Sequence, residues 1–200
     1  SHAEEKELIN PTSAPTQKRW PWTSSQNYPG QSQTKEVLSQ KVLSLCEKDS
    51  TSDSKFGTWQ DIFEQVRRER SSAADLLCFM SFLNPQGTPK FILEAYQRHL
   101  GSSKASLDQD IGFLTGCSLV TAAKEDGALE MHPAVHSSTR MQISSAATAT
   151  RWKIWPGQLQ KDEEAWKRTL LHVFSSEYPD PHDTGGQGIC QRLDPHIGFI

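Results

Sequence analysis

The sequence is short of several features that would assign it to a familiar class of protein. No run of about 18 or more apolar residues occurs, which argues against a transmembrane helix. No apolar secretory segment stands near the N-terminus. The cysteines are few and include no C-x-x-C pair; they are Cys46, Cys78, Cys117 and Cys190. We therefore expect a cytoplasmic, reducing location, with Cys78 and Cys117 as buried apolar residues rather than disulfide partners.

The motifs of common catalytic sites are also missing. The chain has no G-x-x-x-x-G-K-[ST] phosphate loop, so it cannot bind nucleotide by that route. It has no G-x-S-x-G motif, which disfavours a hydrolase. His132 and His136 are spaced to share a helix face as zinc ligands, but no H-E-x-x-H pattern and no third ligand accompanies them. We expect no catalytic residue, no metal and no cofactor in the chain itself.

Charge and composition limit the partners and the size of the core. The formal net charge of -3 at pH 7 gives no support to binding of nucleic acid or of an anionic membrane. Hydrophobic residues make up 35% of the chain, which is low, so part of it should lie outside any core. That part is predicted at residues 1–34, rich in Ser, Thr, Gln and Pro, which we expect to be disordered or loosely packed. Alternatively, Trp20-Pro-Trp22 docks elsewhere as a peptide.

Helical spacing of apolar residues dominates the rest of the chain. Residues 35–57 are predicted as a short helix, with Leu38, Val42 and Leu45 on one face, and a linker. A second helix carries Trp59, Ile62, Phe63 and Val66, and Arg67-Arg-Glu-Arg70 is interpreted as its solvated end. A capping box at Ser72-Ala-Ala-Asp75 is expected to start a buried helix, which Asn84-Pro-Gln-Gly87 ends. Leu77, Met80 and Leu83 are predicted as core.

Later segments add helices and a hairpin. Pro89 is expected in the first turn of a third helix, and Ser106 with Gln109 as a capping box of a fourth. Strand composition at 118–122, the turn Asp126-Gly127 and an alternating return strand predict a hairpin. Pro133 then opens a helix to about residue 143. Residues 161–200 are predicted as a helix bearing Trp166, Leu170, Val173 and Phe174, with a tail too short for another helical pair.

These elements predict a mostly α fold: a helical winged-helix-like domain with a short two-stranded β-hairpin, plus a C-terminal helical extension. We place the domain at 58–143, a linker at 144–160 and the helical extension at 161–200. The chain opens with Ser1 rather than Met and is expected to be a fragment or an incomplete gene product.

Several stretches carry a resemblance to a known family. They are 72–89, the most specific, then 59–70, 110–120 and Met131-His132. Together they resemble the winged-helix region that follows the nucleotide-binding core in fungal NB-ARC (STAND, NLR-like) proteins with C-terminal tetratricopeptide repeats. The resemblance implies a non-catalytic regulatory module that couples a nucleotide-binding core, absent here, to a repeat sensor. It also implies that the extension at 161–200 is the incomplete start of a repeat region. The partners of this module would be proteins or adjacent domains, with ATP or ADP only where such a core is joined.

The resemblance gives one residue a role. It implies that His132 contacts the nucleotide in the closed, resting state, where a His at a helix start can donate to a phosphate oxygen. Pro133 stands where many relatives have Asp and cannot make the contacts of that Asp. From the residues alone, the alternative is a structural His at a strand-to-helix corner, bonded to backbone. If the resemblance holds, we expect His132 to be partly exposed in this chain, because its phosphate partner is absent.

Two other functions remain open from the sequence. One is a stand-alone adaptor that binds a protein partner through a face near Trp152 and Trp155. The other is a DNA-binding winged helix that reads the groove with the helix at 132–143. Because Arg140 is the one fixed positive charge in that helix, DNA binding is the less favoured of the two.

Overall fold

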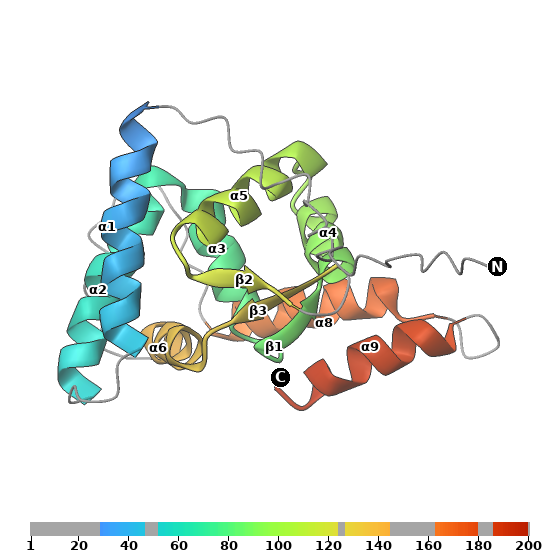
Figure 1. Cartoon of the computed structure of the whole chain (residues 1–200). Helices are drawn as coiled ribbons and strands as arrows, with labels where there is room; N and C mark the ends of the chain where they lie inside the picture. Colours follow the sequence, from blue (N-terminus) through green and yellow to red (C-terminus); the bar gives the residue numbers. More distant parts are fainter. Residues whose placement is uncertain (1–28, 47–51, 124–126, 145–162, 180–185, 200) are drawn as a thin grey trace, which may run out of the picture.

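The computed structural model describes residues 29–46, 52–123, 127–144, 163–179 and 186–199. The Trp20-Pro-Trp22 peptide, the linker at 145–160 and the face near Trp152 and Trp155 lie outside these residues. The fold is mostly α, as the sequence predicts (Figure 1). The helices are α1 (Pro29–Cys46), α2 (Ser52–Glu69), α3 (Ser71–Met80), α4 (Lys90–His99), α5 (Lys104–Gly116), α6 (Pro133–Ser144), α8 (Glu163–Glu177) and α9 (Gln187–Ile197). None of these described helices is long and apolar enough to cross a membrane.

A small antiparallel sheet lies beside the helices and has one strand more than predicted. The strands β2 (Val120–Ala122) and β3 (Ala128–Met131) form the expected hairpin, with Val120 opposite Met131. The third strand, β1 (Gln86–Pro89), pairs with the other side of β3, so the order is β1-β3-β2. Strand β1 was not predicted, because its Gly and Pro are typical of the end of a helix. Pro89 accordingly lies before α4 in extended backbone, φ -67° and ψ 135°, and not in its first turn.

In the order α3, β1, α4, α5, β2, β3, the two consecutive helices α4 and α5 precede the β2–β3 hairpin. Gly101 in the connection between α4 and α5 has φ +69°, a left-handed conformation that favours glycine. The capping box predicted at Ser106 is wrong in position. Ser103 is the N-cap of α5, and its hydroxyl accepts a hydrogen bond from the Ser106 amide.

The first predicted capping box is also wrong, for a different reason. Helix α3 follows α2 with Arg70 alone between them, and no side chain caps its first turn. The Ser72 hydroxyl instead donates to Asp110 on α5, at 2.8 Å. A tertiary partner has therefore replaced the local hydrogen bond that the sequence pattern favours. Although α3 ends at Met80, the predicted core residues Leu77, Met80 and Leu83 are all buried.

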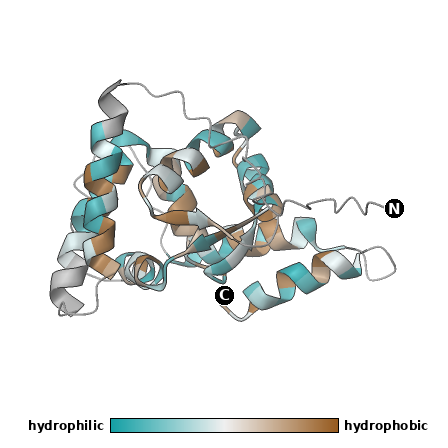
Figure 2. Ribbon diagram, in the orientation of Figure 1, coloured by the Kyte–Doolittle hydropathy of each residue, from teal (hydrophilic) through white to brown (hydrophobic). Residues whose placement is uncertain are grey.

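The flanking helices are longer or more numerous than expected. Helix α1 begins at Pro29, inside the segment 1–34, and α2 begins at Ser52, inside the expected linker. The tail beyond α8 forms another helix, α9, which the sequence analysis missed. One continuous hydrophobic core draws residues from all these helices, including Leu38 of α1, Trp166 of α8 and Leu193 of α9. Figure 2 shows apolar ribbon faces turned inward along α1, α2 and α3.

Helix α9 is held by contacts too far apart in sequence to be foreseen. The Asn84 amide, just before β1, donates to Nδ1 of the buried His196 at 3.0 Å. The Tyr178 hydroxyl, just after α8, hydrogen-bonds to Asp194 at 3.1 Å. Because Leu193 on the same helix is fully buried, α9 completes the core and is not a free tail.

Candidate functional site

His132 lies at the corner between β3 and α6, as predicted, and its side chain is exposed. Its Nδ1 accepts a hydrogen bond from the Ala134 amide at 3.1 Å. Pro133 has no amide hydrogen to donate, so Ala134 offers the first free N–H of α6. The imidazole therefore caps the helix in the way that Asn or Asp side chains commonly do. The side chain is exposed, as the resemblance implies, and it makes the bond to backbone that the structural alternative predicts.

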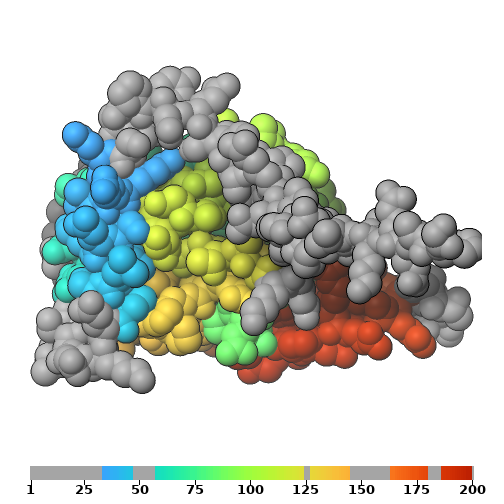
Figure 3. All heavy atoms as spheres, viewed as in Figure 1, coloured from blue at the N-terminus to red at the C-terminus, as the bar shows by residue number. Residues whose placement is uncertain are grey.

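A cysteine from the end of α1, distant in sequence, completes this corner. Cys46 is the last residue of α1, and its Sγ lies 3.2 Å from Nδ1 of His132. On the face shown in Figure 3, the end of α1 lies beside α6. We call Cys46, His132 and Ala134 the corner cluster. Nothing in the sequence pattern pointed to Cys46, because 86 positions separate it from His132.

The hydrogen bonds of the corner cluster fix the form of the imidazole. A backbone amide can only donate, so Nδ1 carries a lone pair and the proton of the neutral ring is on Nε2. The Cys46 thiol must then donate to the same Nδ1. Within the described part of the chain, no side chain or carbonyl accepts from Nε2. The corner thus keeps an N–H donor without a partner among the described residues, on an exposed side chain at the positive end of the α6 dipole.

His136 does not join His132 in a metal site. Its Nε2 bonds to the Leu83 carbonyl at 3.1 Å, and its ring packs edge-on to Phe199 with centroids 6.0 Å apart. Burial lowers the pKa of His136, which favours the neutral ring. Among the residues that the structure describes, no three His, Cys, Asp or Glu side chains are grouped to hold a metal ion.

Helices α5 and α6 are the two candidates for contact with DNA. If α4 and α5 acted as a helix-turn-helix, the second helix, α5, would enter the major groove. Its sequence contains one basic residue, Lys104, and two acidic ones, Asp108 and Asp110. On α6, Arg140 already stacks on Phe82, with Cζ 3.9 Å from the ring centroid. Neither helix offers the set of free Lys and Arg that phosphate contacts require.

A second polar cluster surrounds the buried carboxylate of Asp110, and the sequence pattern did not predict it. Asp110 has a fully buried side chain and accepts from Ser72 and from Nε of Arg70. Arg70 also donates to Gln109 at 2.9 Å. Arg70 is therefore not the solvated helix end that was predicted: its side chain is 27% exposed and ties the α2–α3 junction to α5. We call Arg70, Ser72, Gln109 and Asp110 the buried cluster and assign it a structural role.

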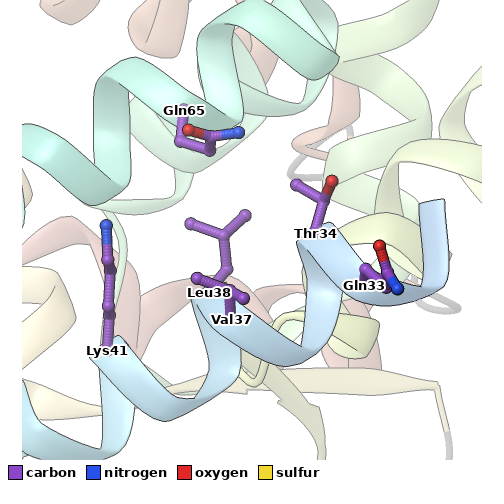
Figure 4. Close-up of a pocket in the computed structure, with 6 residues that line it drawn as sticks. All are labelled: Gln33, Thr34, Val37, Leu38, Lys41 and Gln65. Atoms are coloured by element: carbon purple, nitrogen blue, oxygen red, sulfur yellow. The ribbon is translucent and has the colours of Figure 1, made fainter. Parts of the chain in front are cut away.

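A shallow groove between α1 and α2 offers no chemistry of its own. It encloses about 220 Å³ and is lined by Gln33, Thr34, Val37, Leu38, Lys41 and Gln65 (Figure 4). Lys41 is its only ionisable side chain, so no acid–base or nucleophile pair lines the groove. Its apolar wall suits packing against another protein better than catalysis.

Comparison with known proteins gives one match. Residues 64–148 match the family described as "Domain of unknown function (DUF7779)". The matched region runs from within α2 past the end of α6 and covers less than half of the chain. No curated protein and no solved structure matches the chain. The match delimits a recurrent region that contains His132, Arg70 and Asp110, and its description states no function.

Proposed function

We propose that the chain is a non-catalytic regulatory module of a fungal NLR-like STAND protein, coupling a nucleotide-binding core outside this chain to a repeat sensor. The observation that carries the proposal is the exposed His132 at the start of α6, with its Nε2–H directed away from the hydrogen bonds of Nδ1. The resemblance of 72–89, 110–120 and Met131-His132 to the winged-helix region of such proteins supplies the biological setting.

The proposed mechanism uses His132 as a contact to a phosphate group held by the neighbouring core. A neutral imidazole donates through Nε2, and the dipole of α6 favours the negative charge at the same end. The bonds to Ala134 and Cys46 hold the ring in place, so less freedom is lost when the contact forms. When the phosphate contact is lost, the module moves as a rigid body from the closed to the open state.

An interaction adaptor is the second candidate. Val37 and Leu43 on α1 are 53% and 60% exposed, and Val37 lines the groove between α1 and α2. Exposed apolar side chains beside a groove fit a protein partner. In both readings the partners are proteins or adjacent domains rather than nucleic acid or membrane. We place the protein in the cytoplasm, where its thiols would stay reduced.

Calorimetric titration of the chain with Mg·ADP and Mg·ATP tests the non-catalytic part of the proposal. We expect no measurable binding and no hydrolysis, because the chain has no phosphate loop and a single His contact cannot hold a nucleotide. A dissociation constant in the micromolar range would overturn the proposal. Titration with duplex DNA at low and high salt is the companion test, and salt-dependent binding would favour the DNA-binding alternative.

A further inference from the structure

We infer that Cys46 is a reactive thiol that hydroperoxides oxidise, with His132 acting as its general base. The inference rests on the side-chain geometry of the corner cluster and is independent of the proposed phosphate contact. Sγ of Cys46 and Nδ1 of His132 are 3.2 Å apart, within the distance at which a thiol donates to nitrogen. A nucleophile hydrogen-bonded to a base from another element is the arrangement that activates thiols in enzymes and redox sensors.

The other three thiols show why Cys46 is distinct. All four cysteines are free of disulfides. Cys78 and Cys117 are buried, and burial raises the pKa of Cys117 to about 12, which leaves it as an unreactive thiol. Cys190 is half-buried, as Cys46 is, but its polar neighbour is the Tyr178 side chain rather than an imidazole. Cys190 is therefore the internal control for exposure without a base.

The reaction balances with a hydroperoxide as oxidant. The Cys46 proton passes to Nδ1 of His132 as Sγ attacks the distal oxygen of the hydroperoxide. The O–O bond breaks, the alkoxide or hydroxide leaves with the electron pair, and the imidazolium returns the proton to it, which gives the alcohol or water. Sulfur loses two electrons and becomes the sulfenic acid S–OH, which a small thiol can reduce again.

The same step reaches the first turn of α6. Nδ1 has one lone pair, shared between the Cys46 thiol and the Ala134 amide. While Nδ1 holds the transferred proton, it cannot accept from Ala134. The sulfenic hydroxyl that forms then competes with this amide for Nδ1. Oxidation of Cys46 thus weakens the hydrogen bond between the Ala134 amide and Nδ1 that caps α6.

Peroxide oxidation of the folded chain tests the inference residue by residue. The chain is treated with hydrogen peroxide, sulfenic acid is trapped with dimedone, and each Cys peptide is quantified by mass spectrometry over time. We expect the Cys46 rate constant to exceed that of Cys190 by about tenfold or more, given the usual size of general-base effects. His132→Asn is the matched variant, because Asn can still cap α6 but cannot take the proton at neutral pH.

The outcomes separate the two roles of His132. In His132→Asn, the Cys46 rate should fall to the level of Cys190 while the Cys190 rate stays unchanged. Equal rates for Cys46 and Cys190 in the wild type would overturn the inference, as would an undiminished Cys46 rate in a folded His132→Asn chain. If the oxidation rates of Cys46 and Cys190 both rose in the variant, the substitution would have loosened the fold. That result would also count against a base role for His132.

Discussion

The buried cluster and the corner cluster both join helices distant in sequence, but they differ in what surrounds them. In the buried cluster, Asp110 is fully buried and its Oδ2 has no hydrogen-bond partner among the described residues. In the corner cluster, His132 is exposed and its Nε2 has no hydrogen-bond partner among the described residues. A fully enclosed charge such as that of Asp110 has a structural role, because removal of its cationic partner leaves the charge uncompensated. Polar groups that keep one side open can add a contact with another molecule at little cost to folding.

The largest effect is expected from the core that both clusters border. Leu77→Ala should lower the free energy of unfolding by roughly 2–5 kcal/mol, because Leu77 is fully buried in α3 and its truncation leaves a cavity. Denaturant titration followed by circular dichroism measures this. An unchanged midpoint would show that α3 is not the central helix. Leu43→Ala on the exposed face of α1 is the control and should change stability little.

Within the buried cluster, the two ends of the ion pair should respond unequally. Arg70→Ala leaves the carboxylate of Asp110 buried without a cation and should cost about 3 kcal/mol. In Asp110→Ala, the partly exposed Arg70 can turn toward water, so the loss should be smaller. Unfolding free energies of the two single variants and the double variant decide this. Equal losses would mean that Arg70, like Asp110, has no route to solvent.

A pH dependence is expected from the buried His196, which lies away from both clusters. Burial lowers its pKa from 6.5 to about 4, so the folded state favours the neutral ring. The stability contributed by the neutral ring is complete above pH 6.5 and is lost as pH falls toward 4. Between pH 7 and pH 5 the loss should be about 2 kcal/mol.

Comparison with His196→Gln isolates the contribution of His196 to the pH dependence of stability, because Gln can accept from the Asn84 amide without titrating. The difference in unfolding free energy between the two proteins should shrink as pH falls. If both stability curves kept the same slope over this range, His196 would not be the titrating group.

The smallest effect is expected at the corner cluster. His132→Ala removes the cap of α6 and should cost about 1 kcal/mol, a typical value for a lost N-cap. His132→Asp should restore the stability, since Asp is a good N-cap and its charge suits the helix dipole. Thermal melts of the three proteins test this order. A loss in His132→Asp as large as in His132→Ala would exclude the capping role.

Regular spacing of apolar residues allowed most helices and the hairpin to be predicted. The burial of Trp59, Ile62, Leu77 and Leu170 follows from helical period alone. The capping-box patterns led to wrong predictions. Ser72 and Gln109 bind residues outside their own helices and do not cap those helices. Strand β1 was hidden by Gly87 and Pro89, which tertiary pairing with β3 accommodates.

The candidate site was predictable only in part. His132 could be placed at a strand-to-helix corner because the alternating strand precedes it and Pro133 follows. Cys46 could not be placed there, since its proximity depends on how α1 packs against α6. Likewise, Asp110 stands in an apolar stripe between Leu107 and Ile111, which in hindsight signals a buried charge that needs a partner.

The most direct test of the regulatory proposal is the rate at which ADP leaves a protein in which a nucleotide-binding core precedes this module. Loss of bound nucleotide is followed by chromatography for the wild type and for His132→Asp. The variant preserves the cap of α6, but its carboxylate repels phosphate. We predict that ADP dissociates roughly tenfold faster or more, the equivalent of one lost hydrogen bond to a charged group. An unchanged dissociation rate in a folded variant would contradict the account and leave His132 as a structural cap.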